Sequence, residues 1–330
     1  MSIVAPEKIL KELADLWVST GKEGGEAESQ GVLRACSMTL VVIGEAAEDA
    51  AALGETIAAL MPEHPARAIV IRLTGPGERA LEQRVYAQCW MPFGQRRQIC
   101  CEQVEISCSD AALADLPSVV LPLAVPDLPL FLWCRSPRLL DRPEFREIAD
   151  MADRLVLDSA RLADPKAALE RVAAEVQAGR LVADLAWTQL TRWREMLAEV
   201  FENRQNLAHL AGTVNFTVGD GGAVTTRALY MAAWVKDALE SLHVAIQVTI
   251  SANPNQQPFF LDLASGGFTV RLERRQERML TTVNGLCQST HLPLPNDYLL
   301  MREELGIVRR DPVFEKALAL AARLAYATDK

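Results

Sequence analysis

Apolar residues recur along the chain with two different periods, and the alternation between these periods outlines strands and helices. The run MTLVVIG, which starts at Met38, is followed by a segment of helical period over residues 47–65 and then by a second apolar run, ARAIVIRLT. A short run buried on both faces, then a helix, then another such run is typical of a parallel α/β unit. Further strands are expected at residues 96–107, 128–136 and 153–160, with helices at 143–151 and 165–177.

The pattern changes character after Gly179. A long helical stretch, a strand and a helix over residues 225–242 are followed by short strands with turn residues between them, up to residue 285. This succession is typical of an antiparallel meander, and two helical segments close the chain. We therefore expect a Rossmann-like α/β domain over residues 32–180 and an α+β domain with a mostly antiparallel sheet over residues 181–330.

Residues 1–31 belong to neither of these domains. After Pro6, one helical stripe carries Ile9, Leu10, Leu13, Leu16 and Trp17, and the segment Ser19–Gly31 then contains little apolar area and several glycines. The sequence predicts an amphipathic helix followed by a flexible linker. The apolar stripe needs a surface to pack on, and its own chain is favoured over a partner protein.

One apolar run is long enough to resemble a membrane-spanning helix. Leu116–Cys134 spans 19 residues, but it contains four prolines and Asp127. Proline removes a backbone donor and a charge is costly in hydrocarbon, so we predict two short buried elements separated by a turn. The sequence MSIVAPEKIL lacks the features of a signal peptide, and we expect a cytoplasmic location without membrane association.

Charge and metal-ligand content exclude several classes of function. The 34 Lys and Arg against 43 Asp and Glu give a net charge of −9, which disfavours nucleic acid as a partner. The four histidines are not spaced as zinc ligands, and no CxxC motif occurs. We expect no metal site.

Catalytic signatures are missing as well. A dinucleotide-binding turn needs closely spaced glycines, whereas Gly44 is followed by Glu45, Glu48 and Asp49, whose charges repel phosphate at a helix N-terminus. The Walker and GxSxG patterns are also absent. Catalytic groups can assemble from distant positions, but the sequence favours a protein with no catalytic residues and no bound cofactor.

Three cysteines are weak candidates for redox chemistry. Cys100 and Cys101 are adjacent in a predicted strand, where neighbouring side chains face opposite ways, so small buried side chains are favoured over a redox switch. Cys89 lies in YAQCWMPFGQRR, which is predicted to be an exposed loop and is a better setting for a reactive thiol. The seven cysteines are odd in number and scattered along the chain, which favours reduced thiols as the default.

Two segments carry residues that are enriched at protein interfaces. The first, CWMPFGQRRQ, supplies Trp90, Phe93, Arg96 and Arg97, and a lid over the domain's own core explains it equally well. The second, DLAWTQLTRWRE, supplies Trp187, Arg192 and Trp193. A buried inter-domain helix whose arginines pair with Asp184 or Glu195 explains this segment at least as well as partner binding.

Several strings resemble one known family, the glucose-6-phosphate dehydrogenase assembly proteins called OpcA. The strings that carry the resemblance are spread from about residue 36 to beyond residue 240: MTLVVIGE, PEHPAR followed by AIVIRL, YAQCWMPFGQRRQICCEQVEI, LPLAVPDLPLFLWCRS, DLAWTQLTRWRE and GAVTTRALYMAAWVKDAL. The resemblance implies a non-catalytic partner of glucose-6-phosphate dehydrogenase that promotes its oligomerisation or raises its activity in the oxidative pentose phosphate pathway. It also implies redox control in photosynthetic bacteria, although no cysteine here matches a regulatory pair.

The residues and the resemblance together favour an allosteric assembly factor for the dehydrogenase. Two alternatives stay open. A small molecule or a substrate could bind in the α/β cleft, or the protein could be a thiol-based redox adaptor. Stabilisation by nucleotides or sugar phosphates would favour the former, and a partner affinity that depends on reductant would favour the latter.

Overall fold

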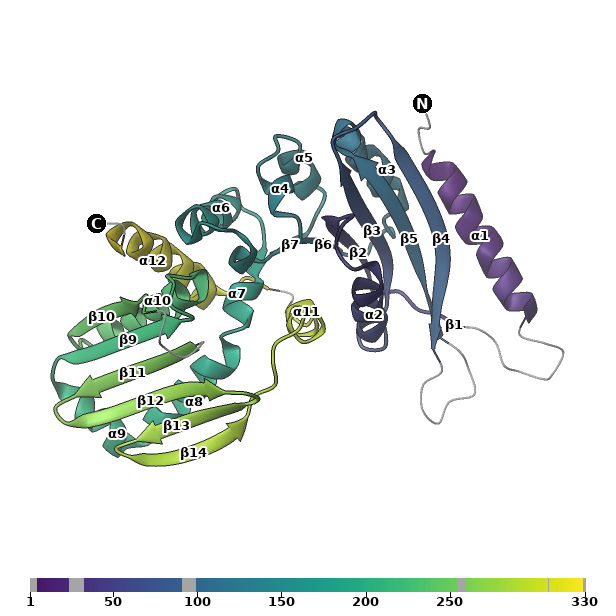
Figure 1. The fold of residues 1–330 in the computed structure, drawn as a ribbon. Helices are drawn as coiled ribbons and strands as arrows, with labels where there is room; N and C mark the ends of the chain where they lie inside the picture. The colour runs from purple at the N-terminus through teal and green to yellow at the C-terminus, as the bar shows by residue number, and fades with distance from the viewer. Residues whose placement is uncertain (1–4, 24–32, 91–98, 254–258, 308, 329–330) are drawn as a thin grey trace. The chain divides into compact units, whose positions relative to one another are not determined.

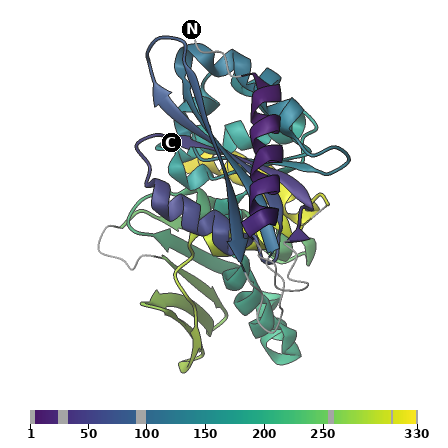
Figure 2. The same ribbon diagram turned by 90° about the vertical axis from the view of Figure 1, so that its right-hand side faces the viewer.

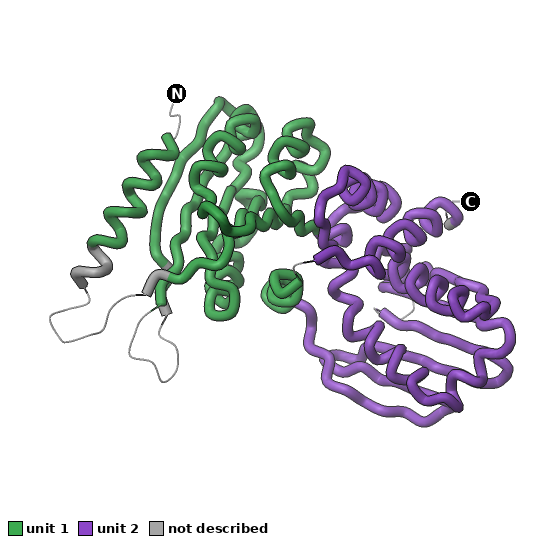
Figure 3. Tube along the Cα trace, turned by 180° about the vertical axis from the view of Figure 1, so that it is seen from behind, with its two compact units in different colours: residues 1–157, 297–308 green, residues 158–296, 309–330 purple. Residues whose placement is uncertain are grey.

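The computed structural model describes residues 5–23, 33–90, 99–253, 259–307 and 309–328. The chain forms two compact units, shown in green and purple in Figure 3. Unit 1 comprises residues 1–157 and 297–308, and unit 2 comprises residues 158–296 and 309–330. This division differs from the boundary predicted at residue 180, because the helix over residues 165–177 packs on the C-terminal helix.

Unit 1 is built on a mostly parallel sheet (Figure 1). Its strands are β1 (Leu33–Arg34), β2 (Met38–Glu45), β3 (Ala66–Gly75), β4 (Leu81–Trp90), β5 (Ile99–Ser109), β6 (Leu130–Cys134) and β7 (Arg154–Leu157). They are ordered β1-β5-β3-β2-β6-β7, and β4 pairs antiparallel with β5. The chain leaves β2 toward β3 and later returns to its other side with β6, which creates a topological switch point between β2 and β6.

The helices of unit 1 include the predicted N-terminal helix and several short ones. They are α1 (Pro6–Glu23), α2 (Ala50–Leu60), η1 (Asp110–Asp115), α3 (Leu116–Leu123), α4 (Pro137–Leu140), α5 (Phe145–Ala149) and α11 (Asp297–Leu305). The apolar run Leu116–Cys134 thus becomes α3 and β6, joined by a turn in which Asp127 has a φ of 63°. In the part of the chain that the structure describes, no helix has the length and apolar content needed to cross a membrane.

Helix α1 packs on its own chain, as predicted. It contacts β4 and α3, and Figure 2 shows it lying in front of the strands of unit 1. Ile9 and Leu13 are buried, and the Trp17 indole N–H donates a hydrogen bond to Glu102. Glu102 also accepts from the buried guanidinium of Arg67, at 2.5 Å. The helix extends to Glu23, into the segment predicted as linker.

Two leucines of α1 offer a matched test of this packing. Leu13 is 2 % exposed and Leu10 is 37 % exposed. Leu13→Ala leaves a cavity under the helix and is expected to cost about 3 kcal/mol, whereas Leu10→Ala is expected to cost less than about 1 kcal/mol. Hydrogen exchange of the α1 amides provides the measurement. Equal exchange in the two variants would show that the helix does not rest on this stripe.

Unit 2 is built on a six-stranded, mostly antiparallel sheet with the order β10-β9-β11-β12-β13-β14. These strands are β9 (Val214–Asp220), β10 (Ile246–Ser251), β11 (Phe259–Ser265), β12 (Phe268–Arg275), β13 (Arg278–Val283) and β14 (Leu286–His291), and only the β9–β10 pair of this sheet is parallel in the described ranges. The mixed α/β fold, with one mostly parallel and one mostly antiparallel sheet, agrees with the sequence expectation.

The helices of unit 2 pack on one another and on this sheet. They are η2 (Ser159–Arg161), α6 (Pro165–Gln177), α7 (Leu185–Thr188), α8 (Thr191–Glu202), α9 (Arg204–Ala208), η3 (His209–Ala211), α10 (Thr226–Ser241) and α12 (Pro312–Thr328), and the short strand β8 (Val182–Asp184) precedes α7. Helix α10 contacts α12, β9 and β10, and nine of its residues are buried. It therefore forms the centre of the unit 2 core.

A buried carboxyl group ties three segments of unit 2 together. Asp184 caps α7 by accepting from the Ala186 N–H at 3.0 Å, and the same oxygen accepts from the Ser159 N–H at 3.0 Å. The Tyr230 hydroxyl of α10 donates to its other oxygen at 2.7 Å. Burial raises the pKa of Asp184 and, together with the adjacent carboxyl group, that of Tyr230. The Asp184 side chain is therefore the acceptor for two backbone N–H groups and one hydroxyl from three segments of unit 2.

Candidate functional site

The carboxyl ends of β2 and β6 form the edge where open α/β sheets bind ligands. At the end of β2, the Glu48 carboxylate folds back over Gly44 and accepts from the Glu45 N–H at 3.4 Å. The next residue, Asp49, caps α2 by accepting from the N–H groups of Ala51 and Ala52 at 2.9 and 3.2 Å. The protein's own carboxylates thus take the donors that a phosphate would use.

Two arginines that follow β6 complete this edge. Arg135 pairs with Glu48 at 2.8 Å and with Asp297 of α11, and its guanidinium lies 4.6 Å from the centre of the Trp133 ring. Arg138 pairs with Glu45 at 2.9 Å and with Asp110 at 2.6 Å. These contacts raise the pKa of Arg138, and the hydrogen bond that its guanidinium donates to Glu45 is the largest cause. At this edge of the sheet, both arginines are therefore paired with acidic side chains of the protein itself.

The doubly wound topology implies a dinucleotide at this edge, but the residues present do not fit one. A pyrophosphate needs unpaired N–H groups and close backbone approach, whereas Glu45, Glu48 and Asp49 place three carboxylates at the first turn. Arg135 and Arg138 are already engaged with acidic side chains. The acidic residues noted in the sequence are therefore the groups that fill the turn.

A polar cavity of about 240 Å³ lies beside α2 in unit 1. Its lining includes Arg72, Tyr86, Gln103 and Glu105. The Arg72 guanidinium donates to the Ala46 and Glu48 carbonyls at 2.7 and 2.9 Å, and the Tyr86 hydroxyl donates to Glu105 at 3.3 Å. Burial raises the pKa of Tyr86. These polar groups are engaged with one another or with backbone carbonyls, and the cavity is large enough to hold a small polar molecule.

The first group of partner-binding candidates lies at one hairpin. Cys89 and Trp90 end β4, and the Trp90 backbone pairs with Ile99 at the start of β5. Phe93, Arg96 and Arg97 fall in the connection, outside the described residues, and the side chain of Trp90 is likewise not described. Residues 86–90, which were predicted as part of a loop, instead belong to the strand Leu81–Trp90, which the sequence did not reveal.

The second group of candidates occupies two different environments. Trp187 and Trp193 are only 5 % and 3 % exposed, so the prediction that they contact a partner is not supported. Trp187 packs against Tyr230 and Phe314 under the Arg194 guanidinium, and Trp193 packs edge-on against Phe259. Arg192 is exposed and pairs with Glu195 at 2.7 Å, which is the ion pair foreseen for a structural helix.

The redox candidates correct the expectation of reduced thiols. Cys89 and Cys100 face each other across the β4–β5 pair and form a disulfide, with a Cα–Cα distance of 4.0 Å. Cys101 is a buried free thiol, as expected for a small apolar side chain, and burial raises its pKa to about 11. The bond closes the hairpin that carries Trp90, Phe93, Arg96 and Arg97.

Reduction of this bond is expected to destabilise unit 1. The closed segment spans a sequence separation of 11, for which loop entropy gives about 3 kcal/mol. Urea unfolding of the parent should therefore shift to lower midpoint with reductant, and Cys89→Ser should abolish the shift. Cys287→Ser is the control, because Cys287 is exposed and free. An unfolding midpoint that ignores reductant in the parent would contradict the expectation.

Two family models of known proteins match most of the chain. A family model described as the glucose-6-phosphate dehydrogenase subunit N-terminal domain matches residues 57–174, and one described as its C-terminal domain matches residues 180–318. A protein from Synechocystis sp. provisionally named OxPP cycle protein OpcA is 25 % identical over 224 residues, which are 64 % of this chain and 46 % of the relative. Its Nostoc punctiforme counterpart is 28 % identical over 56 % of this chain and 40 % of the relative. The chain thus matches less than half the length of these relatives.

Solved structures give more distant matches. A 3-ketoreductase from Actinomadura kijaniata shares 10 % identity with a TM-score of 0.47, over 91 % of this chain and 97 % of the other. A biliverdin reductase from Synechocystis sp. shares 11 % identity with a TM-score of 0.46, over 88 % and 98 %. Likeness at this level does not indicate a shared activity.

Proposed function

Because this chain belongs to the OpcA family of glucose-6-phosphate dehydrogenase assembly proteins, we propose that it binds that dehydrogenase and favours its active oligomer without catalysing a reaction itself. The observation that carries the proposal is the match of two family models, in order, across most of the chain. The edge filled by Glu45, Glu48 and Asp49 supports a binding role over turnover.

The proposed mechanism is linkage between binding and assembly. A partner that binds the assembled, substrate-competent dehydrogenase more tightly than the dissociated form shifts the population by that difference in affinity. A tenfold shift in the ratio of assembled to dissociated dehydrogenase needs a difference in binding free energy of only about 1.4 kcal/mol. One or two buried aromatic contacts supply a difference of this size. No chemical step by this chain is required.

The hairpin between β4 and β5 is the contact surface that we propose. Phe93, Arg96 and Arg97 combine aromatic area with guanidinium groups, and the strands on both sides together with the Cys89–Cys100 bond fix the two ends of their segment. Trp90 adds a further aromatic residue where β4 ends. Arg192, which is exposed on α8, is proposed as a peripheral contact, and Trp187 and Trp193 as the core that holds this helix.

Co-sedimentation of the two proteins tests the proposal directly. The purified chain and the dehydrogenase of the same organism are mixed and analysed by sedimentation velocity. The proposal expects a faster-sedimenting complex and a larger share of the dehydrogenase in its oligomer. Independent sedimentation of the two proteins, at concentrations above those in the cell, would refute it.

A redox-adaptor function is a second candidate, because the Cys89–Cys100 disulfide closes the same hairpin. It predicts that reductant changes the affinity for the dehydrogenase and that Cys89→Ser removes the change. A small-molecule function would instead use the polar cavity around Arg72 and Tyr86. It predicts a thermal shift with nucleotides or sugar phosphates in the absence of the dehydrogenase.

A further inference from the structure

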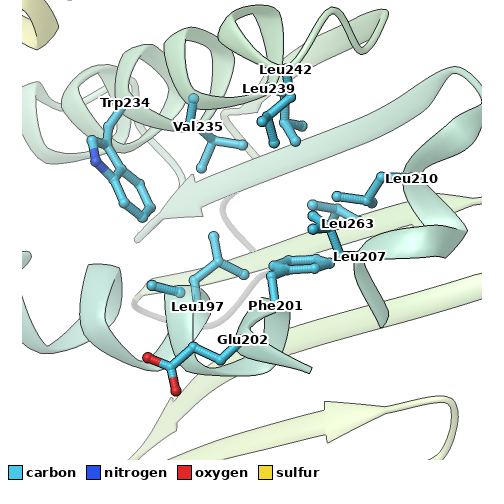
Figure 4. Close-up of a pocket in the computed structure, with 12 residues that line it drawn as sticks. Leu197, Phe201, Glu202, Leu207, Leu210, Trp234, Val235, Leu239, Leu242 and Leu263 are labelled. Carbon is cyan, nitrogen blue, oxygen red and sulfur yellow. The ribbon is translucent and has the colours of Figure 1, made fainter. Parts of the chain in front are cut away.

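Unit 2 contains an apolar cavity of about 290 Å³ between α8 and α10 (Figure 4). Leu197 and Phe201 line it from α8, Trp234 and Leu239 line it from α10, and Leu263 of β11 also lines it. The space has roughly ten times the volume of a water molecule in the liquid, but its walls offer almost no polar surface to hold water. It suits two or three apolar side chains.

The apolar surface continues outward from the cavity. Leu207 and Leu242, which also line it, are 40 % and 56 % exposed, and Ala198 and Ala238 are exposed as well. Large exposed aliphatic side chains that adjoin an apolar cavity mark an interaction surface better than scattered single ones do. A small molecule confined to the cavity would leave both leucines in water, whereas a longer occupant covers them.

The shape of this groove fits a helix. Its α10 wall is formed by residues 234, 235, 238, 239 and 242, which share one face of the helix, and its α8 wall by residues 197, 198, 201 and 202. From Trp234 to Leu242 the wall is about 12 Å long, since a helix rises 1.5 Å per residue. That length accommodates side chains at positions i, i+4 and i+7 of an incoming amphipathic helix.

The charged residues at the rim of the groove indicate which kind of amphipathic helix fits it. Glu202 is the one charged residue among the side chains that line the groove, and Glu199 lies one turn earlier on α8. Both are exposed, and neither forms an ion pair with the residues that the structure describes, whereas Lys236 and Lys316 are engaged with Glu240 and Asp237. Arg204, two residues after Glu202, does not line the groove. The α8 rim is therefore acidic.

We propose that this groove binds an amphipathic helix of a partner protein, with apolar side chains in the cavity and lysine or arginine facing Glu199 and Glu202. This surface is built only from unit 2, whereas the hairpin proposed for the dehydrogenase belongs to unit 1. The inference therefore holds whether or not the dehydrogenase supplies the helix.

Fluorescence anisotropy with model peptides tests the groove in the full chain. The probe is a labelled helical peptide of about twelve residues, slightly more than three turns, with leucine at positions i, i+4 and i+7 and lysine on its flanks. A second peptide carries glutamate in place of lysine. Saturable binding of the lysine peptide is expected, at least about tenfold tighter than that of the glutamate peptide. No saturable binding, or equal binding of both peptides, overturns the proposal.

Two variants locate the binding in the groove. Ala238→Trp fills it and is expected to abolish binding, while Ala174→Trp, at an exposed alanine of α6, is the matched control and should bind like the parent. Glu202→Lys should weaken the lysine peptide and strengthen the glutamate peptide. Because Ala174, Glu202 and Ala238 are all exposed, the three variants should unfold at the parent's urea midpoint.

Other occupants would give different results. Uptake of an apolar dye that Ala238→Trp blocks, without peptide binding, would show a small-molecule pocket. Concentration-dependent sedimentation of the parent that Ala238→Trp abolishes would show a second copy of this chain in the groove. Each of these results would overturn the proposal.

Discussion

Asp184→Ala is expected to lower the free energy of unfolding of unit 2 by about 3 to 5 kcal/mol. Asp184 is 1 % exposed and is the acceptor for Ser159, Ala186 and Tyr230. Its removal leaves these three buried donors without their acceptor. The measurement is urea unfolding monitored by tryptophan fluorescence.

Two controls separate the buried network from a simple helix cap. Asp164→Ala removes an exposed cap of α6, which accepts from Lys166 N–H, and should cost only about 1 kcal/mol. Asp184→Asn keeps an acceptor and a similar volume, so its cost should lie well below that of alanine. If Asp184→Ala costs no more than Asp164→Ala, the network does not hold unit 2 together.

The pH dependence of this site has a defined sign. Burial raises the pKa of Asp184 in the folded protein above its unfolded value of about 4. The folded state therefore holds this proton more tightly, and the resulting stabilisation is full below about pH 4 and is lost as the pH rises through the folded pKa. Asp184→Asn should remove this contribution from the stability profile.

Phe93→Ala combined with Arg97→Ala is expected to weaken binding to the dehydrogenase by at least about tenfold, equivalent to about 1.4 kcal/mol or more. An aromatic side chain and a guanidinium on one hairpin are the residue types that dominate interface energies. Biolayer interferometry with the immobilised dehydrogenase provides the dissociation constants. The double variant must unfold at the parent's midpoint for the comparison to hold.

The controls for this variant come from other exposed arginines. Arg192→Ala, on α8, should weaken binding by a few-fold at most, because its guanidinium is exposed and already paired with Glu195. Arg278→Ala, whose guanidinium contacts Ser289 in the unit 2 sheet, should bind like the parent. A folded double variant with the parent's affinity would exclude the hairpin as the contact surface.

The sequence predicted elements where one period dominates. Strands β2 and β3 are nearly all apolar, and α6 begins at the Asp164 cap followed by Pro165, so their bounds were close to those expected. Strand β4 was missed because LEQRVYAQCW mixes charged and apolar residues without a continuous buried run. Its partner β5 supplies the hydrogen bonds, and only the fold brings the two together.

The sequence also does not predict which distant segments of the chain pack on each other. Residues 297–308 return to unit 1, where Glu304 pairs with the buried Arg154 at 2.8 Å and the Ile307 carbonyl accepts from it at 2.7 Å. Nothing near either residue in the chain indicates this contact. A helical pattern predicts α11 but not the unit on which it packs, so the predicted domain boundary and the structural units differ.

The candidate site was predictable in its chemistry but not in its geometry. Glu45, Glu48 and Asp49 in place of glycines already argued against phosphate. The Glu48 and Asp49 side chains do take up backbone donors of that turn, and the Glu45 carboxylate pairs with Arg138. Trp187 and Trp193 have the composition of an interface, yet composition does not distinguish an exposed aromatic from a buried one. Burial is decided by α10, α12 and β11, which are distant in sequence.

The substrate saturation of glucose-6-phosphate dehydrogenase, measured with and without this protein, tests the proposed function most directly. Rates are recorded against glucose-6-phosphate at a fixed dehydrogenase concentration, with increasing amounts of the chain or of its Phe93→Ala, Arg97→Ala variant. The proposal predicts a higher rate at subsaturating substrate that saturates with added protein and is reduced in the variant. Superimposable curves with and without the protein, under conditions where the dehydrogenase is partly dissociated, would contradict it.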